Sequence, residues 1–166
     1  MEKRVREIPS DADLYASGPR LPEELTRWPM YVMSRAVQRG WVLLARRLEV
    51  EGLSPRLHAV LAVVDARKPI SQQAIADLLR IDRTTMIGIA DEAEAADLIS
   101  RTRDRSDRRR YALRLTEAGE RALARADRLV AEAHAELLGE LDEGERALLH
   151  ELLLRTVPAA DTDYPG

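Results

Sequence analysis

The sequence predicts a mainly helical protein with a small β-hairpin, and residues 70–116 carry that prediction. Ser71 stands at an N-cap position, and the apolar residues after it follow helical spacing: Ala74, Ile75, Leu78 and Leu79. Asp82 then caps a second helix. Two β-type runs, 98–102 and 111–115, follow on either side of a loop crowded with arginine. A helix-turn-helix followed by a two-stranded hairpin is the order of elements in a winged helix.

The composition is that of a charged globular protein with an aliphatic core. The chain has 166 residues, of which 45% are apolar and 33% charged, with no Phe and no Cys. The absence of cysteine excludes disulfides and thiolate nucleophiles. No apolar run reaches the roughly 18 residues that cross a bilayer, and the N-terminal residues do not resemble a signal peptide. We therefore expect a cytoplasmic protein with no membrane contact.

Positive charge is concentrated in the predicted hairpin loop, although the formal net charge of the chain is −3. Six arginines stand against two aspartates between residues 101 and 110. A local basic patch attracts nucleic acid even on an acidic protein. An arginine-rich loop is generally more often a solvated turn, but its place beside a helix-turn-helix favours contact with DNA.

Four further helices are predicted around this stretch. The first begins at Trp28-Pro29, with proline in the first turn, and continues to about Glu51. Its main apolar face carries Met33, Val37, Trp41, Leu44 and Leu48. Ser54-Pro55 opens the second helix, and Ile70 after it is a candidate third strand. The buried stripe of this second helix is Leu57, Val60, Leu61 and Val64.

The last two of these helices follow the hairpin. Thr116 caps a long helix that Gly139 ends, and Asp142 with Glu145 forms a capping box for the final one. The final helix carries Leu148, Leu149, Leu152, Leu153 and Val157.

These helices have more apolar surface than one small lobe can cover, which predicts an intertwined dimer with a shared helical frame. The predicted division is an arm (1–27), one domain (28–157) and a tail (158–166). Within the domain we expect a DNA-binding lobe (54–116) and three dimerisation helices (28–51, 117–138 and 143–157).

Four segments resemble the MarR (multiple antibiotic resistance regulator) family of bacterial transcription factors: Leu53-Ser54-Pro55-Arg56, the run 71–83, the loop Arg-Asp-Arg-Ser-Asp-Arg-Arg at 103–109, and Leu-Thr-Glu-Ala-Gly at 115–119. The resemblance covers about residues 28–157. It implies a helical dimer with two winged-helix lobes that bind a pseudo-palindromic operator. In many members it also implies a small-molecule effector that weakens DNA binding.

The chain departs from the family pattern in and after the second helix of the helix-turn-helix. Ile87-Gly88 stands where the family commonly has a polar or basic pair, and Asp97 replaces a glycine usual before the first wing strand. The helix beyond Gly88 is acidic, with Asp91, Glu92 and Glu94.

The DNA-binding candidates lie on the recognition helix, in the wing and at the edge of the lobe. Arg83, Thr84 and Thr85 are placed to meet phosphates or base edges, and Ile87 to touch a thymine methyl, while Met86, Ile89, Ala90 and Ala93 should face the core. The alternative for either threonine is that it only caps or solvates the helix. Arg105, Arg108 and Arg109 are the wing candidates for the minor groove or backbone, and the family resemblance suggests that Asp107 orders one of them. Arg56, Gln72 and Gln73 are further candidates for phosphate contact.

An effector site is predicted where the resembling family places its pockets, between the first, second and fifth helices near the lobe. The candidate lining residues are Trp28, Tyr31, Arg35, Trp41 and His58. The plainer interpretation makes Trp41 a core residue and His58 a satisfied surface or interface residue. We favour it, because no spacing marks a specific ligand.

The sequence predicts no enzyme, cofactor or metal site. His58, His134 and His150 lack zinc-binding spacing, and the chain has no glycine-rich phosphate loop or Gly-x-Ser-x-Gly motif. The expected function is that of a homodimeric repressor bound to double-stranded DNA and released by a small-molecule effector, with an aromatic or phenolic compound as the candidate. The alternative is a helical interaction module or anti-regulator of the same fold with reduced sequence-specific DNA reading, which Ile87-Gly88 and the acidic helix suggest.

Overall fold

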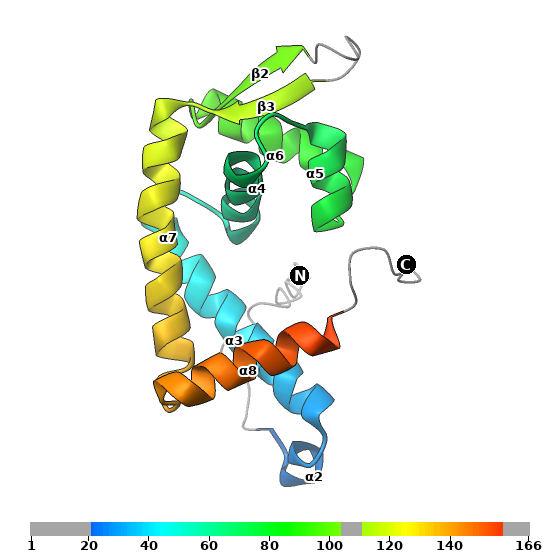
Figure 1. Cartoon of the computed structure of the whole chain (residues 1–166), viewed down its shortest axis with the longest axis vertical. Coiled ribbons are helices and arrows are strands. Elements are labelled where there is room, and N and C mark those ends of the chain that lie inside the picture. The colour runs from blue at the N-terminus through cyan, green and yellow to red at the C-terminus, as the bar shows by residue number, and fades with distance from the viewer. Residues whose placement is uncertain (1–20, 104–110, 158–166) are drawn as a thin grey trace, which may run out of the picture.

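A computed structural model describes residues 21–103 and 111–157 and confirms a mainly helical fold with a small antiparallel sheet (Figure 1). Of the predicted arm, only the part from residue 21 is described, and the tail 158–166 lies outside the described residues. The elements are α2 (Glu23–Thr26), α3 (Pro29–Glu49), α4 (Pro55–Ala66), β1 (Ile70–Ser71), α5 (Gln72–Leu79), α6 (Arg83–Ala95), β2 (Ile99–Arg103), β3 (Tyr111–Leu115), α7 (Glu117–Leu137) and α8 (Glu143–Thr156).

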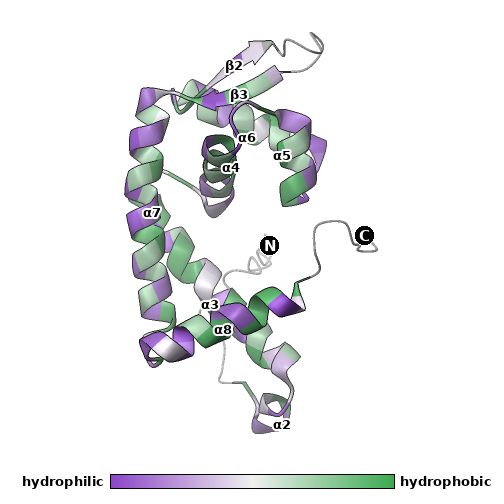
Figure 2. Ribbon diagram, viewed as in Figure 1, coloured by the Kyte–Doolittle hydropathy of each residue, from purple (hydrophilic) through white to green (hydrophobic). Residues whose placement is uncertain are grey.

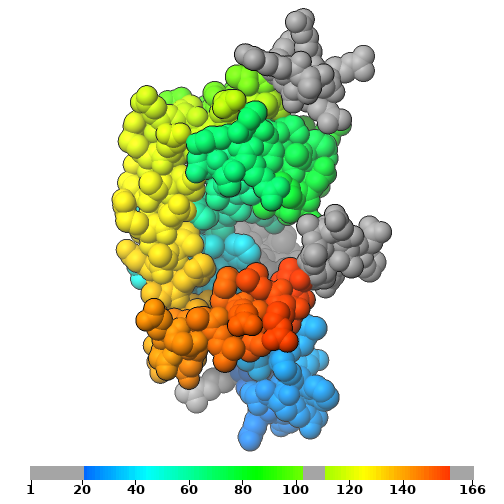
Figure 3. Space-filling view, in the orientation of Figure 1, coloured from blue at the N-terminus to red at the C-terminus, as the bar shows by residue number. Residues whose placement is uncertain are grey.

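The elements form a winged lobe and a helical frame, joined along α7 (Figure 1). The lobe contains α4, α5, α6 and the three strands, whereas α3 and α8 lie toward the other end of the molecule. Helix α7 begins beside the wing and packs along α3. In the space-filling view the lobe and α8 are separate masses that α7 connects (Figure 3).

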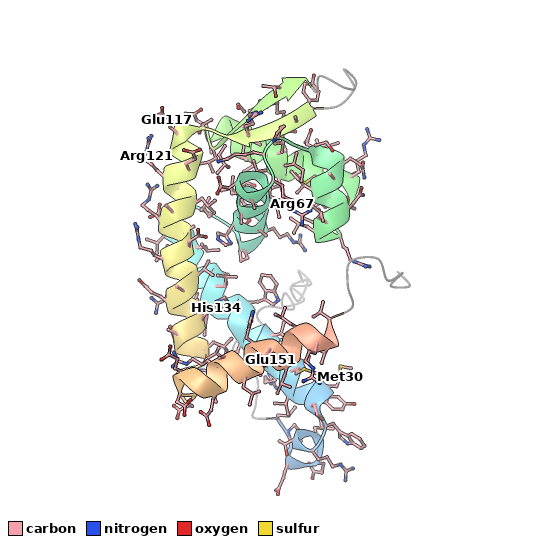
Figure 4. The ribbon with its side chains drawn as sticks, in the orientation of Figure 1. Met30, Arg67, Glu117, Arg121, His134 and Glu151 are labelled. Carbon is pink, nitrogen blue, oxygen red and sulfur yellow. The ribbon has the colours of Figure 1, made fainter. Side chains whose placement is uncertain are left out.

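The predicted N-caps are confirmed, which explains why the helices begin where they do. Each capping side chain accepts a hydrogen bond from the backbone N–H three residues ahead, and the caps are Ser54, Ser71, Asp82, Thr116 and Asp142. Asp142 and Glu145 form both bonds of a capping box. Farther along the surface, Glu117 and Arg121 form an ion pair of 3.7 Å across one turn of α7 (Figure 4).

The sheet has the strand order β1-β3-β2, with both pairs antiparallel. Ile70 pairs with Leu113, so the predicted third strand is present. Arg101 opposes Leu113 from the other side, and Arg103 opposes Tyr111 at the end of β2 from which the wing loop leaves.

The hydrophobic core is centred on α4 and lies between this helix and the elements that pack against it. The predicted stripe of α4 is entirely buried and packs with Ile75, Met86 and Leu113 of the lobe and with Leu48 of α3. Leu78 differs from the helical pattern, because it is 41% exposed. The buried face of α5 centres on Ile75 and Ala76, which leaves Leu78 on its flank.

Ion pairs hold α7 against α3 along the frame. The Arg47 guanidinium contacts Glu132 at 2.5 Å and Glu136 at 2.8 Å, and Arg125 contacts Glu51 at 2.7 Å. The hydrogen bond with Glu136, and then the attraction of both carboxylates, raises the pKa of Arg47 above its ordinary value. Exposed pairs contribute little stability one by one, but together they set the register of one helix along the other.

The first turn of α7 is fastened to the connection between α6 and β2. The Thr116 N–H donates to the Leu98 carbonyl at 3.1 Å, and the Thr116 hydroxyl donates to the carbonyl of Asp97. A Cβ at Gly119 would lie 1.9 Å from the Leu98 oxygen, so only glycine permits this approach. Asp97, which replaces the family glycine, has a φ of 56°, in the left-handed region that favours glycine.

Candidate nucleic-acid interface

The N-terminus of α6 is built on Asp82, which makes two bonds with Thr85. One Asp82 oxygen accepts the Thr85 N–H at 3.0 Å, and the other accepts the Thr85 hydroxyl. The bond from the hydroxyl, followed by that from the N–H, lowers the pKa of Asp82 below its usual range. Thr85 is half-buried and its hydroxyl is hydrogen-bonded to the capping aspartate, so its polar group supports the helix N-terminus, which is close to the alternative role considered for a threonine here.

Helix α6 has one face in the core and one face in solvent. Met86, Ile89, Ala90 and Ala93 are buried, as predicted. The opposite face presents Arg83, Thr84, Ile87 and Gly88, all of them exposed. Arg83 forms no hydrogen bond or ion pair with any residue that the structure describes. A capped helix terminus with an uncommitted cation suits contact with a phosphate backbone.

The three candidates for phosphate contact outside α6 differ in whether their polar side-chain groups are exposed and free of other hydrogen bonds. Arg56 is exposed in the first turn of α4. Gln73 donates its amide to Asp77 at 2.8 Å. The Gln72 amide nitrogen is buried and has no hydrogen-bond partner within residues 21–103 and 111–157. Of the three, Arg56 presents its polar group to solvent most directly.

The acidic half of α6 forms ion pairs with strand β2 of the wing. The sequence did not predict this contact. Arg101 of β2 donates a hydrogen bond to Asp91, and its Nε lies 3.3 Å from Glu94 without hydrogen-bond alignment. The Arg101 side chain is only 18% exposed. Two of the acidic side chains on α6 therefore neutralise an arginine that counted toward the basic loop, and they connect recognition helix and wing.

The wing candidates Arg105, Arg108 and Arg109, together with Asp107, lie outside the described residues. The strands on either side of this segment are described, and β2 and β3 pair up to Arg103 and Tyr111. The base of the predicted arginine-rich loop is thus a regular antiparallel ladder next to α6.

The structure does not bring the five effector candidates together within one chain. Trp28 and Trp41 lie 13 residues apart along α3, which corresponds to about 20 Å of helix. Trp41 is 54% exposed, so the interpretation of Trp41 as a core residue is wrong for the single chain. Trp28 and Tyr31 are also exposed, and Arg35 is half-buried. The His58 Nε2 lies 2.9 Å from Asp127 of α7, as expected for a satisfied histidine.

Exposed large apolar side chains are numerous on α8 and on α3 between Met30 and Trp41, and hydrophobic residues occur along both helices in Figure 2. Within α8 no residue is buried. The exposed large apolar side chains of the two helices are Met30, Tyr31, Val32, Met33, Val37 and Trp41 on α3 and Leu148, Leu152, Leu153 and Leu154 on α8. Single subunits rarely expose apolar patches of this extent unless another molecule covers them.

The described residues contain no cluster of three or more His, Cys, Asp or Glu side chains that could hold a metal ion. Within the same residues, no helix has the length and apolar content of a membrane span.

The chain matches a family model described as MarR family over residues 51–110. It is 34% identical over 105 residues to a putative transcriptional regulatory protein for the hcr operon of Thauera aromatica, a match that spans 63% of each chain. Among solved structures it resembles the transcriptional repressor CouR bound to a 23-mer DNA duplex, with a TM-score of 0.75 and 32% identity over 83% of this chain and 98% of that one. It also resembles PcaV of Streptomyces coelicolor in complex with its natural ligand, with a TM-score of 0.70 and 26% identity over 82% and 96% of the two chains. The chain therefore belongs to the MarR family: it is a winged-helix transcription regulator and not an enzyme.

Proposed function

We propose that this protein is a homodimeric repressor that binds a pseudo-palindromic operator through its winged lobes and is released from it by a small-molecule effector. The observation that carries the DNA-binding part is the likeness to CouR, a repressor whose structure contains a DNA duplex, at 32% identity over 98% of that chain. The exposed face of α6 and the arginine-rich wing are the surfaces that would meet DNA.

In this proposal α6 enters the major groove with its capped N-terminus foremost. Arg83 and Thr84 supply exposed donors, and Arg56 reaches the backbone from α4. The wing, with Arg105, Arg108 and Arg109, follows the adjacent minor groove or backbone. Two lobes related by a two-fold axis would meet half-sites about 34 Å apart, which is one turn of B-DNA.

Footprinting with the purified full-length protein tests DNA binding directly. The probes are the segment upstream of its own gene and the neighbouring intergenic DNA. We expect protection of a palindromic site. Absence of protection on all of these probes would refute the proposal and favour the alternative, an interaction module of the same fold.

The substitution Arg108→Ala tests the wing. Loss of one cation from each of two lobes should weaken operator binding and reduce the slope of log K against log salt by about 2 for the dimer. Arg128→Ala is a matched control, because Arg128 is an exposed arginine of α7 outside the proposed interface. Equal affinity and equal salt slope for Arg108→Ala and the unsubstituted protein, in gel shifts at several salt concentrations, would show that this residue does not contact DNA.

The occupant proposed for the apolar surface of α3 and α8 is a second copy of this chain. The surface lies on helices that the sequence predicts for dimerisation, and the α8 leucines Leu148, Leu152, Leu153 and Leu154 are left exposed by the residues that the structure describes. Leu152→Glu would place a carboxylate in the contact, at a cost of about 2–3 kcal/mol per subunit. His150→Glu adds the same group at another exposed position of α8 and serves as the control. Sedimentation should give dimers for the control and monomers for Leu152→Glu; monomers for the unsubstituted protein would refute the dimer.

The proposed effector is an aromatic or phenolic compound, and the support for an effector is PcaV, whose structure contains its natural ligand. Because α3 separates Trp28 from Trp41 by about 20 Å, a single site lined by all five candidates would draw on both subunits. The chain has two tryptophans, so Trp28→Phe and Trp41→Phe variants each report one of them by fluorescence. A panel of phenolic acids that neither quenches either tryptophan nor releases the operator would refute the effector while leaving DNA binding intact.

A further inference from the structure

We propose that Ile87 and Gly88 form an apolar reading surface for thymine methyl groups in the major groove, with Gly88 allowing α6 to come close to the base edges. The inference rests on the proposed DNA-binding function and specifies what the operator must contain.

No contact within the part of the protein that the structure describes requires glycine at position 88. It lies in the interior of α6, where glycine weakens a helix relative to alanine. A Cβ added there meets no atom within 4 Å. Gly119 is the contrasting case, since a Cβ there would meet backbone at 1.9 Å. A glycine that its own fold does not require, on a face that points to solvent, suits close approach by another molecule.

Ile87 supplies an exposed apolar side chain next to Gly88, at the point of close approach. Its side chain is 43% exposed, although isoleucine is among the residues most often buried. Thr84, one turn earlier, lies on the same face, and Asp91, one turn later, is engaged by Arg101. Neither Ile87 nor Gly88 has a side-chain donor or acceptor, so neither can pair with the polar edges of bases. The thymine C5 methyl is the apolar group that the major groove displays.

The test substitutes deoxyuridine for thymine, one position at a time, in the operator that footprinting identifies. Deoxyuridine lacks only the 5-methyl group and keeps every hydrogen-bonding group. We expect one position in each half-site at which affinity, measured by fluorescence anisotropy with the full-length protein, falls about fourfold, the value of one buried methyl-sized group. Substitution in both half-sites should reduce affinity roughly 15-fold.

Protein variants assign the effect to these two residues. Ile87→Ala should abolish the difference between thymine and deoxyuridine operators. Gly88→Ala should bind about tenfold more weakly, because the added methyl overpacks the contact with the base edges, although its fold is more resistant to urea. Gly144→Ala on α8, where an added Cβ meets only the Asp142 side chain at 3.4 Å, is the control and should bind like the unsubstituted protein.

The results that overturn the inference differ from those that overturn DNA binding. A footprint without any uridine-sensitive position refutes the inference alone. The same holds for a uridine penalty that persists in Ile87→Ala, and for unchanged binding by Gly88→Ala. Absence of a footprint refutes the proposed function itself.

Discussion

Substituting alanine at Gly119 would disturb the joint between the wing and α7. The added Cβ would lie 1.9 Å from the Leu98 carbonyl oxygen, 2.8 Å from its carbon and 3.2 Å from its Cα, whereas ordinary contacts begin at 3.4 Å. The clash is with backbone, so no side chain can turn away to relieve it. The Leu98 oxygen is also held by the Thr116 N–H at 3.1 Å, which leaves the two segments little freedom to separate.

The magnitude follows from two opposing effects. Overpacking that displaces backbone costs about 3 kcal/mol at the upper end of its usual range. Alanine is better than glycine in a helix by about 1 kcal/mol, which offsets part of that cost. We therefore expect Gly119→Ala to lower the free energy of unfolding by about 2 kcal/mol. At Gly88, where an added Cβ meets nothing, the helical gain stands alone and Gly88→Ala should raise stability by about 1 kcal/mol.

Urea unfolding followed by far-ultraviolet circular dichroism measures both variants. Because the stability of the proposed dimer would depend on concentration, all proteins are compared at one protein concentration. The expected separation between the two variants is about 3 kcal/mol. A Gly119→Ala protein as stable as the unsubstituted one would refute the reasoning, since it would mean that the approach of α7 to Leu98 is looser than the structure shows.

Three further predictions concern the same lobe. Asp97→Gly should raise the free energy of unfolding by about 0.5–1 kcal/mol in urea, because Asp97 has a φ of 56°; a loss of stability would show that the aspartate side chain compensates for its backbone. The pKa of Asp82 is lowered in the folded state, so its contribution is present above the unfolded value of about 4 and is lost as the pH falls through the folded value. The difference in urea midpoint between the unsubstituted protein and Asp82→Ala should therefore be constant from pH 7 to 5 and shrink toward pH 3; a difference that grows on acidification would contradict the cap. Asp91→Asn removes a negative charge and frees Arg101 in part, so operator affinity at low salt should rise; weaker binding would assign the ion pair a positioning role instead.

The caps and the stripe of α4 could be predicted because they depend on residues a few positions apart. Ser71 and Asp82 accept bonds from N–H groups three residues ahead, a geometry that the local chain fixes by itself. Leu78 shows the limit of such patterns. Its spacing fits a buried face, but which side of a short helix is covered depends on where its neighbours pack.

Contacts between distant elements could not be predicted in this way. The contact of Arg101 with Asp91 and Glu94 depends on how β2 packs against α6, whereas the sequence only counts Arg101 among the positive charges between residues 101 and 110. The effector candidates rest on where the resembling family has its pockets, and the spacing of Trp28 and Trp41 along α3 separates them. The wing arginines Arg105, Arg108 and Arg109 remain predictions from the sequence.

Helix α7 connects two parts of the molecule, so a tilt of the helix at one end displaces its other end. Its 21 residues span about 31 Å, from the wing at one end to the turn before α8 at the other. A tilt of about 5° at the α8 end displaces the first turn by about 3 Å, by the geometry of a rigid rod of that length. Because Gly119 packs closely against the Leu98 backbone, we expect such a displacement to move the wing. In the proposed dimer, a small change in how α3, α7 and α8 pack would then alter the distance between the two recognition helices, to which binding of paired half-sites is sensitive.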